Sequence, residues 1–93
     1  MDDKKILEVI NTYRRVFKLM GVGKIDFPHD RILIDSNKAP AHCHGMLDQM
    51  EKFLREGRRE KVFRWLGFVQ GCLWSASIYT LDDLMNHNRP NKK

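Results

Sequence analysis

Cysteine is scarce in this chain of 93 residues, which contains only Cys43 and Cys72. Two cysteines are too few for the disulfide framework that stabilises many small secreted domains. One bridge is arithmetically possible, but the sequence does not show whether the two Cα atoms come within the ~7 Å that a disulfide requires. The amino-terminal residues also lack an apolar signal core, so we expect reduced thiols and a cytoplasmic location.

Long hydrophobic runs are missing too, apart from one stretch without formal charge at residues 65–81. This stretch only reaches the lower limit, about 17 residues, for a helix that spans a membrane. It contains Gln70, Ser75 and Ser77, and Thr80 has the character of a cap that begins a new helix. We therefore predict a buried helix at the centre of a small bundle, and no membrane partner.

The short length excludes a multidomain enzyme, a large cofactor-binding fold and a transporter, and it allows one domain over residues 1–93. The chain has 17 Lys plus Arg against 12 Asp plus Glu, a formal net charge of +5, and 31% of its residues are charged. Together with an apolar content of 42%, this composition is typical of a globular domain rather than a disordered chain.

Apolar residues recur with the period of an α-helix along most of the chain. The pattern predicts an all-α fold, a small helical bundle of three main helices and a short fourth. The main helices are expected at about residues 3–20, from about residue 40 to 57, and at about 58–78, and the fourth begins at a capping box around Thr80. The expected core consists of Ile6, Ile10, Tyr13, Phe17, Leu47, Met50, Phe53, Leu54, Trp65, Leu66, Val69 and Leu73.

Two segments lack helical periodicity. Residues 21–40 are expected to be irregular, with the apolar residues 31–35 forming an extended strap packed across the helices. The alternative is that residues 31–35 pair with their own copy in a dimer, since a lone strand has no partner for its hydrogen bonds. Residues 88–93 are expected to form a frayed tail.

Small residues recur at every fourth position of the third helix, at Gly67, Gly71 and Ser75. Glycine inside a helix costs about 1 kcal/mol relative to alanine, so we expect an offsetting gain from the close approach of another helix. A helix of the same chain is favoured over a subunit interface, and Gly71→Leu is expected to destabilise the fold by overpacking. Phe68 and Trp74 lie beside this stripe, and they would anchor a partner wherever they are exposed.

The sequence His42-Cys43-His44 contains residue types that bind zinc, but its spacing does not suit a helix. Side chains two positions apart point about 200° apart on a helix, so the two histidines cannot share an ion there. A metal- or thiol-dependent activity around these residues is therefore an alternative that we do not favour. No orienting group or oxyanion loop accompanies Cys43, so we predict no enzyme activity, no catalytic residue, no metal and no cofactor.

A basic run lies at the junction of the second and third helices, formed by Arg55, Arg58, Arg59, Lys61 and Arg64. Positive charge of this density suits phosphate binding, and the pI of about 9.5 points the same way. Glutamates interleave with the basic residues, however, which is typical of a solvated helix face. A small nucleic-acid-binding protein that contacts phosphates through these side chains is therefore the second hypothesis for function.

The carboxyl-terminal half contains three blocks with a familiar pattern: GRREKVFRWLGFVQGCLW at residues 57–74, YTLDDL at 79–84 and NRP at 88–90. These blocks resemble short, uncharacterised proteins that are carried by phages and other mobile elements. The resemblance implies a small accessory protein that binds a host or phage component, and it transfers no catalytic or binding residue. The leading hypothesis is a non-enzymatic accessory or regulatory protein that acts through protein–protein contacts, including those of a homodimer.

Overall fold

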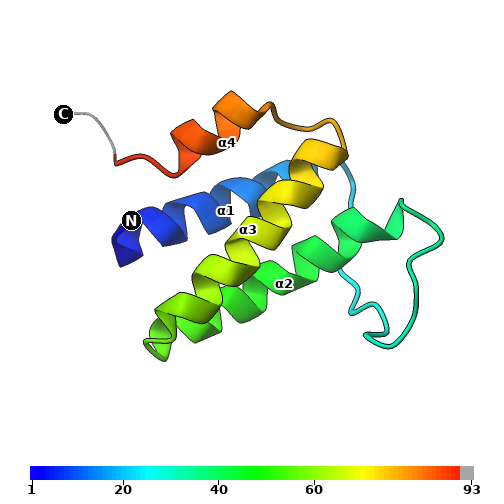
Figure 1. Ribbon diagram of the computed structural model, residues 1–93, viewed down its shortest axis with the longest axis horizontal. Helices are drawn as coiled ribbons and strands as arrows, with labels where there is room; N and C mark the ends of the chain where they lie inside the picture. The colour runs from blue at the N-terminus through cyan, green and yellow to red at the C-terminus, as the bar shows by residue number, and fades with distance from the viewer. Residues whose placement is uncertain (91–93) are drawn as a thin grey trace.

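The computed structural model describes residues 1–90 and contains four α-helices, with no strand among these residues. They are α1 (Asp3–Leu19), α2 (Lys38–Arg55), α3 (Arg59–Ser75) and α4 (Leu81–His87). Figure 1 shows α3 crossing in front of α1 and α2, while the connection between α1 and α2 extends away from the bundle. The prediction of an all-α bundle with three main helices and a short fourth is confirmed.

Glycines in the left-handed conformation end the first two helices. Gly21 and Gly57 have φ values of +72° and +76°, and each begins the chain reversal that follows its helix. The third helix ends in the same way at Ser75, although its left-handed residue is Ser77 with a φ of 63°. Backbone hydrogen bonds from Ser77 to Trp74 and from Ile78 to Leu73 complete this reversal. The predicted end at residue 78 was therefore wrong, because no glycine marks the stop.

The helix starts follow local rules. The Asp2 carboxylate caps α1 by accepting a hydrogen bond of 2.8 Å from the Lys5 amide. The predicted capping box of α4 is confirmed, since Thr80 and Asp83 exchange side-chain and backbone hydrogen bonds of 3.0 Å. Helix α2 begins at Lys38, slightly before the predicted end of the irregular segment, because Pro40 fits within the first turn, where its missing N–H needs no partner.

All the predicted core residues are buried except Trp65, which is half-buried, and the observed core also includes Val9, Cys43, Met46, Val62 and Leu84. The most extensive helix packing joins α2 to α3, and α1 packs on α2. Helix α3 is not enclosed, however, because Phe63, Phe68 and Trp74 are exposed on its outer side. The prediction that α3 occupies the centre of the bundle was therefore wrong.

The connection between α1 and α2 is irregular, as predicted, but its expected packing and the expected fraying at residue 88 were wrong. Residues 31–35 do not pack across the helices, since Ile32 and Ile34 are 86% and 93% exposed. Asn88 is not part of a frayed tail, because its side-chain amide exchanges hydrogen bonds of 2.7 and 3.1 Å with Gln70. Arg89 also donates to Asn86, through its amide at 3.2 Å and its guanidinium at 3.0 Å, and residues 91–93 of the predicted tail lie outside the described part of the chain.

Candidate functional site: a groove beside α2 and α3, and the outer face of α3

The connection between α1 and α2 is held firmly against α2 at its beginning. The Ile25 amide donates a hydrogen bond of 3.2 Å to the Ala41 carbonyl, and the Phe27 amide donates one of 3.0 Å to Nδ1 of His42. Glycine is needed at position 45, because a Cβ atom there would lie 2.7 Å from the Ile25 carbonyl oxygen. These contacts place a fixed wall beside the groove where α2 meets α3.

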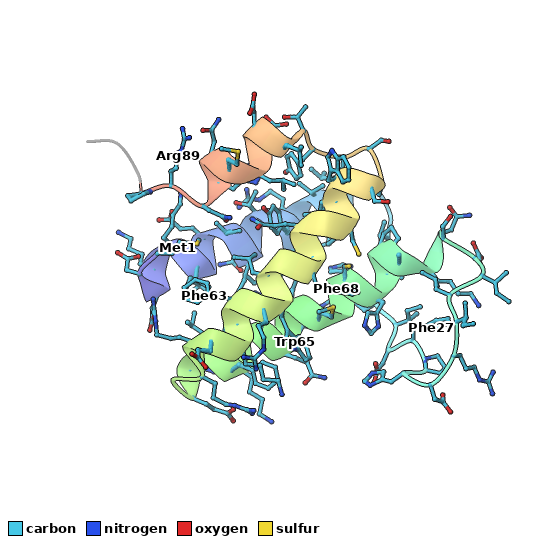
Figure 2. The ribbon with its side chains drawn as sticks, in the orientation of Figure 1. Met1, Phe27, Phe63, Trp65, Phe68 and Arg89 are labelled. Carbon is cyan, nitrogen blue, oxygen red and sulfur yellow. The ribbon has the colours of Figure 1, made fainter. Side chains whose placement is uncertain are left out.

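A groove of about 790 Å³ lies between residues 24–33 and the helices α2 and α3. Aromatic side chains from all three elements line it, and Figure 2 labels three of them, Phe27 from the connection and Trp65 and Phe68 from α3. Phe53 of α2 packs edge to face on Trp65, with ring centroids 5.0 Å apart. The groove therefore has the volume, and the mixture of aromatic, aliphatic and polar lining residues, that are typical of binding sites.

Positive charge lies over these aromatic walls. The Lys61 ammonium sits 4.5 Å from the centroid of Phe53 and 5.6 Å from that of Trp65, which is cation–π geometry. At the other end of the groove, the Lys24 ammonium donates to Asp48 at 2.9 Å. Hydrogen bonds from Lys24 and from Arg14 lower the pKa of Asp48, so this carboxylate stays ionised and its negative charge is balanced by these two cations.

The two cysteines meet at the packed surface between α2 and α3. Cys43 is fully buried, while Cys72 is half-buried and lines the groove. Hydrogen bonding from the Cys43 thiol lowers the pKa of Cys72 to about 7, and the same interaction raises the pKa of Cys43. The pair is a reduced dithiol whose more acidic member is the one that lines the groove.

The two histidines beside Cys43 lie on different sides of α2, as helix geometry predicted. His42 lines the groove and accepts the Phe27 amide at Nδ1, so the proton of its neutral ring is on Nε2. His44 is buried against Phe17 and bonds the Val22 carbonyl through Nδ1, at 3.0 Å, leaving Nε2 without a partner within the described chain. Within residues 1–90, no three His, Cys, Asp or Glu side chains gather closely enough to hold a metal ion.

Carboxylates pair with three of the five predicted basic residues. Ion pairs join Arg55 to Glu51 at 2.7 Å and Arg58 to Glu56 at 3.8 Å. Arg59 faces α1 instead, where it pairs with Asp3 and bonds the Met1 carbonyl.

The remaining two cations of this set, Lys61 and Arg64, have no carboxylate partner among residues 1–90. Three of the five basic residues thus have a carboxylate nearby, and Lys61 and Arg64 are the two that do not within residues 1–90.

The stripe of small residues on α3 faces open space. A Cβ atom built on Gly67 or Gly71 would meet no atom of the chain within 4 Å, and Ser75 is exposed. The prediction that another helix of this chain packs on the two glycines was therefore wrong. Phe68 and Trp74, 55% and 53% exposed, border this open stripe on its two sides.

Sequence reasoning missed a polar network that fixes α4. Gln70, one of two buried polar residues within the described chain, donates to the Tyr13 hydroxyl at 3.0 Å and exchanges hydrogen bonds with Asn88. The Tyr13 hydroxyl lies 2.8 Å from Nδ1 of His87, and burial raises the pKa of Tyr13 to about 12. The signal in the sequence was Gln70 itself, a polar residue within the most apolar stretch.

No helix within residues 1–90 combines the length and the apolar character needed to cross a membrane. Comparisons with protein families, curated proteins and solved structures gave no significant match to this chain.

Proposed function

We propose that this protein is a non-enzymatic accessory protein that acts by binding other proteins, and that the outer face of α3 is its binding surface. We define this face as Phe63, Gly67, Phe68, Gly71 and Trp74. The observation that carries the proposal is that two glycines of the helix interior touch nothing in the chain, although aromatic side chains flank them.

Two physical costs support this assignment. Each helical glycine lowers stability by about 1 kcal/mol relative to alanine, and no packing within residues 1–90 offsets that cost. Exposed aromatic side chains leave apolar area in contact with water, and such patches are typical of sites where proteins interact. A partner helix lying on the glycines would approach the α3 backbone closely and bury Phe68 and Trp74 on either side.

The resemblance of residues 57–74, 79–84 and 88–90 to phage and mobile-element proteins supports the same proposal. It suggests a small accessory protein that binds a host or phage component. The second candidate, a nucleic-acid-binding protein, is supported by Lys61 and Arg64, whose charges are not neutralised by any carboxylate of residues 1–90. Two such cations suit weak backbone contacts without sequence preference.

Site-specific photocrosslinking in the source cell tests the binding surface. A photoreactive phenylalanine derivative at Trp74 should form a discrete adduct with one protein, and Gly71→Arg in the same chain should abolish it. The matched control carries the photoreactive residue at Leu19, which is 82% exposed near the end of α1 and outside the outer face. Identical adducts from the two positions, or an adduct that persists with Gly71→Arg, would refute the proposed surface.

Fluorescence anisotropy with a random DNA duplex and an RNA strand tests the second candidate. Binding through phosphates must weaken steeply as salt is raised, because it depends on counterion release. Loss of that binding in Lys61→Gln and Arg64→Gln variants would favour the nucleic-acid function over the outer face of α3.

A further inference from the structure

The segment 31–35, with the sequence RILID, is the most exposed apolar part of the chain. Residues 32–35 belong to no helix, strand or turn, and Ile32 and Ile34 are 86% and 93% exposed, whereas Leu33 is 41% exposed and lines the groove. Within the described chain, no hydrogen bond involves the backbone of residues 32–34. A non-helical segment with unpaired amides and carbonyls and two exposed β-branched side chains has the groups that strand pairing with another segment requires.

The charges of this segment indicate which strand it pairs with. Arg31 stands at one end and Asp35 at the other, with three apolar residues between them. An antiparallel pair of two such segments, with Leu33 on the two-fold axis, sets each Arg31 opposite Asp35 of the second copy. The same register sets Ile32 opposite Ile34 of the second copy, so that four isoleucines share one face of the ribbon.

Other arrangements lack this complementarity. A parallel pair in register would place Arg31 beside Arg31 and Asp35 beside Asp35, and like charges directly opposite each other are destabilising. Each end is also available for an ion pair, because Arg31 has no carboxylate partner within residues 1–90. Asp35 is exposed and bonds only nearby backbone amides within residues 1–90.

We infer that residues 31–35 join two copies of this chain as a two-stranded antiparallel ribbon centred on Leu33. The inference rests on the proposed function in so far as it names one protein partner, but it uses a surface separate from the outer face of α3. A ribbon of five residues is marginal by itself, so the dimer is weak and forms at high protein concentration.

Sedimentation velocity over a wide range of concentrations tests the pairing. The wild-type chain is expected to self-associate, and Asp35→Arg or Arg31→Asp alone should weaken association about tenfold, because like charges then face each other at both ends of the ribbon. The double variant Arg31→Asp with Asp35→Arg should restore association, since the charges are exchanged but remain complementary. Asp30→Arg is the matched control, because it changes the net charge as Asp35→Arg does but lies opposite the neutral Ser36 in this register.

A disulfide across the axis provides a second measurement. In a Cys43→Ala, Cys72→Ala background, Leu33→Cys should form a covalent dimer on mild oxidation much faster than Leu19→Cys. A chain that remains monomeric at every concentration overturns the inference. Self-association that is unchanged by Asp35→Arg and Arg31→Asp but is lost with Gly71→Arg also overturns the inference, and it supports the outer face of α3 as the binding surface. If association depends on the charges of residues 31 and 35 but no adduct forms at Trp74, the pairing of residues 31–35 is supported and the outer face of α3 is refuted as a binding surface.

Discussion

Alanine at Gly67 and Gly71 should make this protein more stable. Each substitution adds a methyl group that meets no atom within 4 Å, so no packing penalty opposes the gain in helix propensity. The expected increase in the free energy of unfolding is about 0.5–1 kcal/mol for each glycine. The two effects should add, because the two methyl groups share no neighbouring atom.

Thermal unfolding followed by circular dichroism measures this directly. For a domain of this size, each kcal/mol raises the melting temperature by roughly 4–8 °C. Gly45→Ala is the matched control, since it is also a helical glycine but its Cβ would lie 2.7 Å from the Ile25 carbonyl oxygen. It should destabilise the fold by about 1–3 kcal/mol, because the carbonyl must move and the groove wall moves with it. A lower melting temperature for Gly67→Ala or Gly71→Ala would show that a helix packs on the stripe and would refute the open face.

Three further predictions concern single contacts. Burial and the nearby Lys5 charge lower the pKa of His87 in the native state, although Asp83 opposes this shift. The contribution of neutral His87 to the free energy of unfolding is therefore fully present above about pH 6.5, and it is lost as the pH falls through the lower native pKa. Chemical denaturation at several pH values should show a weaker pH dependence for His87→Gln than for the wild-type chain. Ser77→Gly should stabilise the fold by about 0.5–1 kcal/mol, because Ser77 has a φ of 63°, and an unchanged denaturation midpoint would contradict this. Hydrogen peroxide should convert Cys43 and Cys72 to an intramolecular disulfide with release of two waters, seen by mass spectrometry as the loss of two hydrogens; overoxidation of Cys72 without that loss would count against the dithiol.

The start of α4 and the helical positions of the core were predictable because both depend on residues close in the chain. The Thr80 capping box is a local exchange of hydrogen bonds, and the buried positions repeat with the helical period whatever the helix packs against. The end of α3 was not predictable, because Ser77 adopts a conformation that usually marks glycine. Nothing in the sequence around Ser77 distinguishes it from a residue that continues the helix.

The candidate sites were only partly predictable, because they depend on how the helices cross. The sequence showed an apolar helix with two glycines, but periodicity does not indicate which neighbour covers each face. The contact of Cys43 with Cys72 and that of Gln70 with Asn88 also follow from the crossing of elements far apart in the chain. The groove has the same origin, since its outer wall depends on a carbonyl that approaches α2 only where position 45 has no side chain.

The exposed apolar side chains of α3 and of residues 31–35 are not part of the contacts that stabilise the fold. The buried network around Gln70 and the apolar core are complete without Phe68, Trp74, Ile32 or Ile34. Because these side chains are mostly exposed, replacing them should change the stability of the isolated chain by only about 0.5 kcal/mol each. The stability of the isolated chain therefore does not require them, and the open glycines of α3 reduce that stability further. Binding to another chain supplies the contacts that would offset both costs, which is why the outer face of α3 and residues 31–35 are assigned to partners.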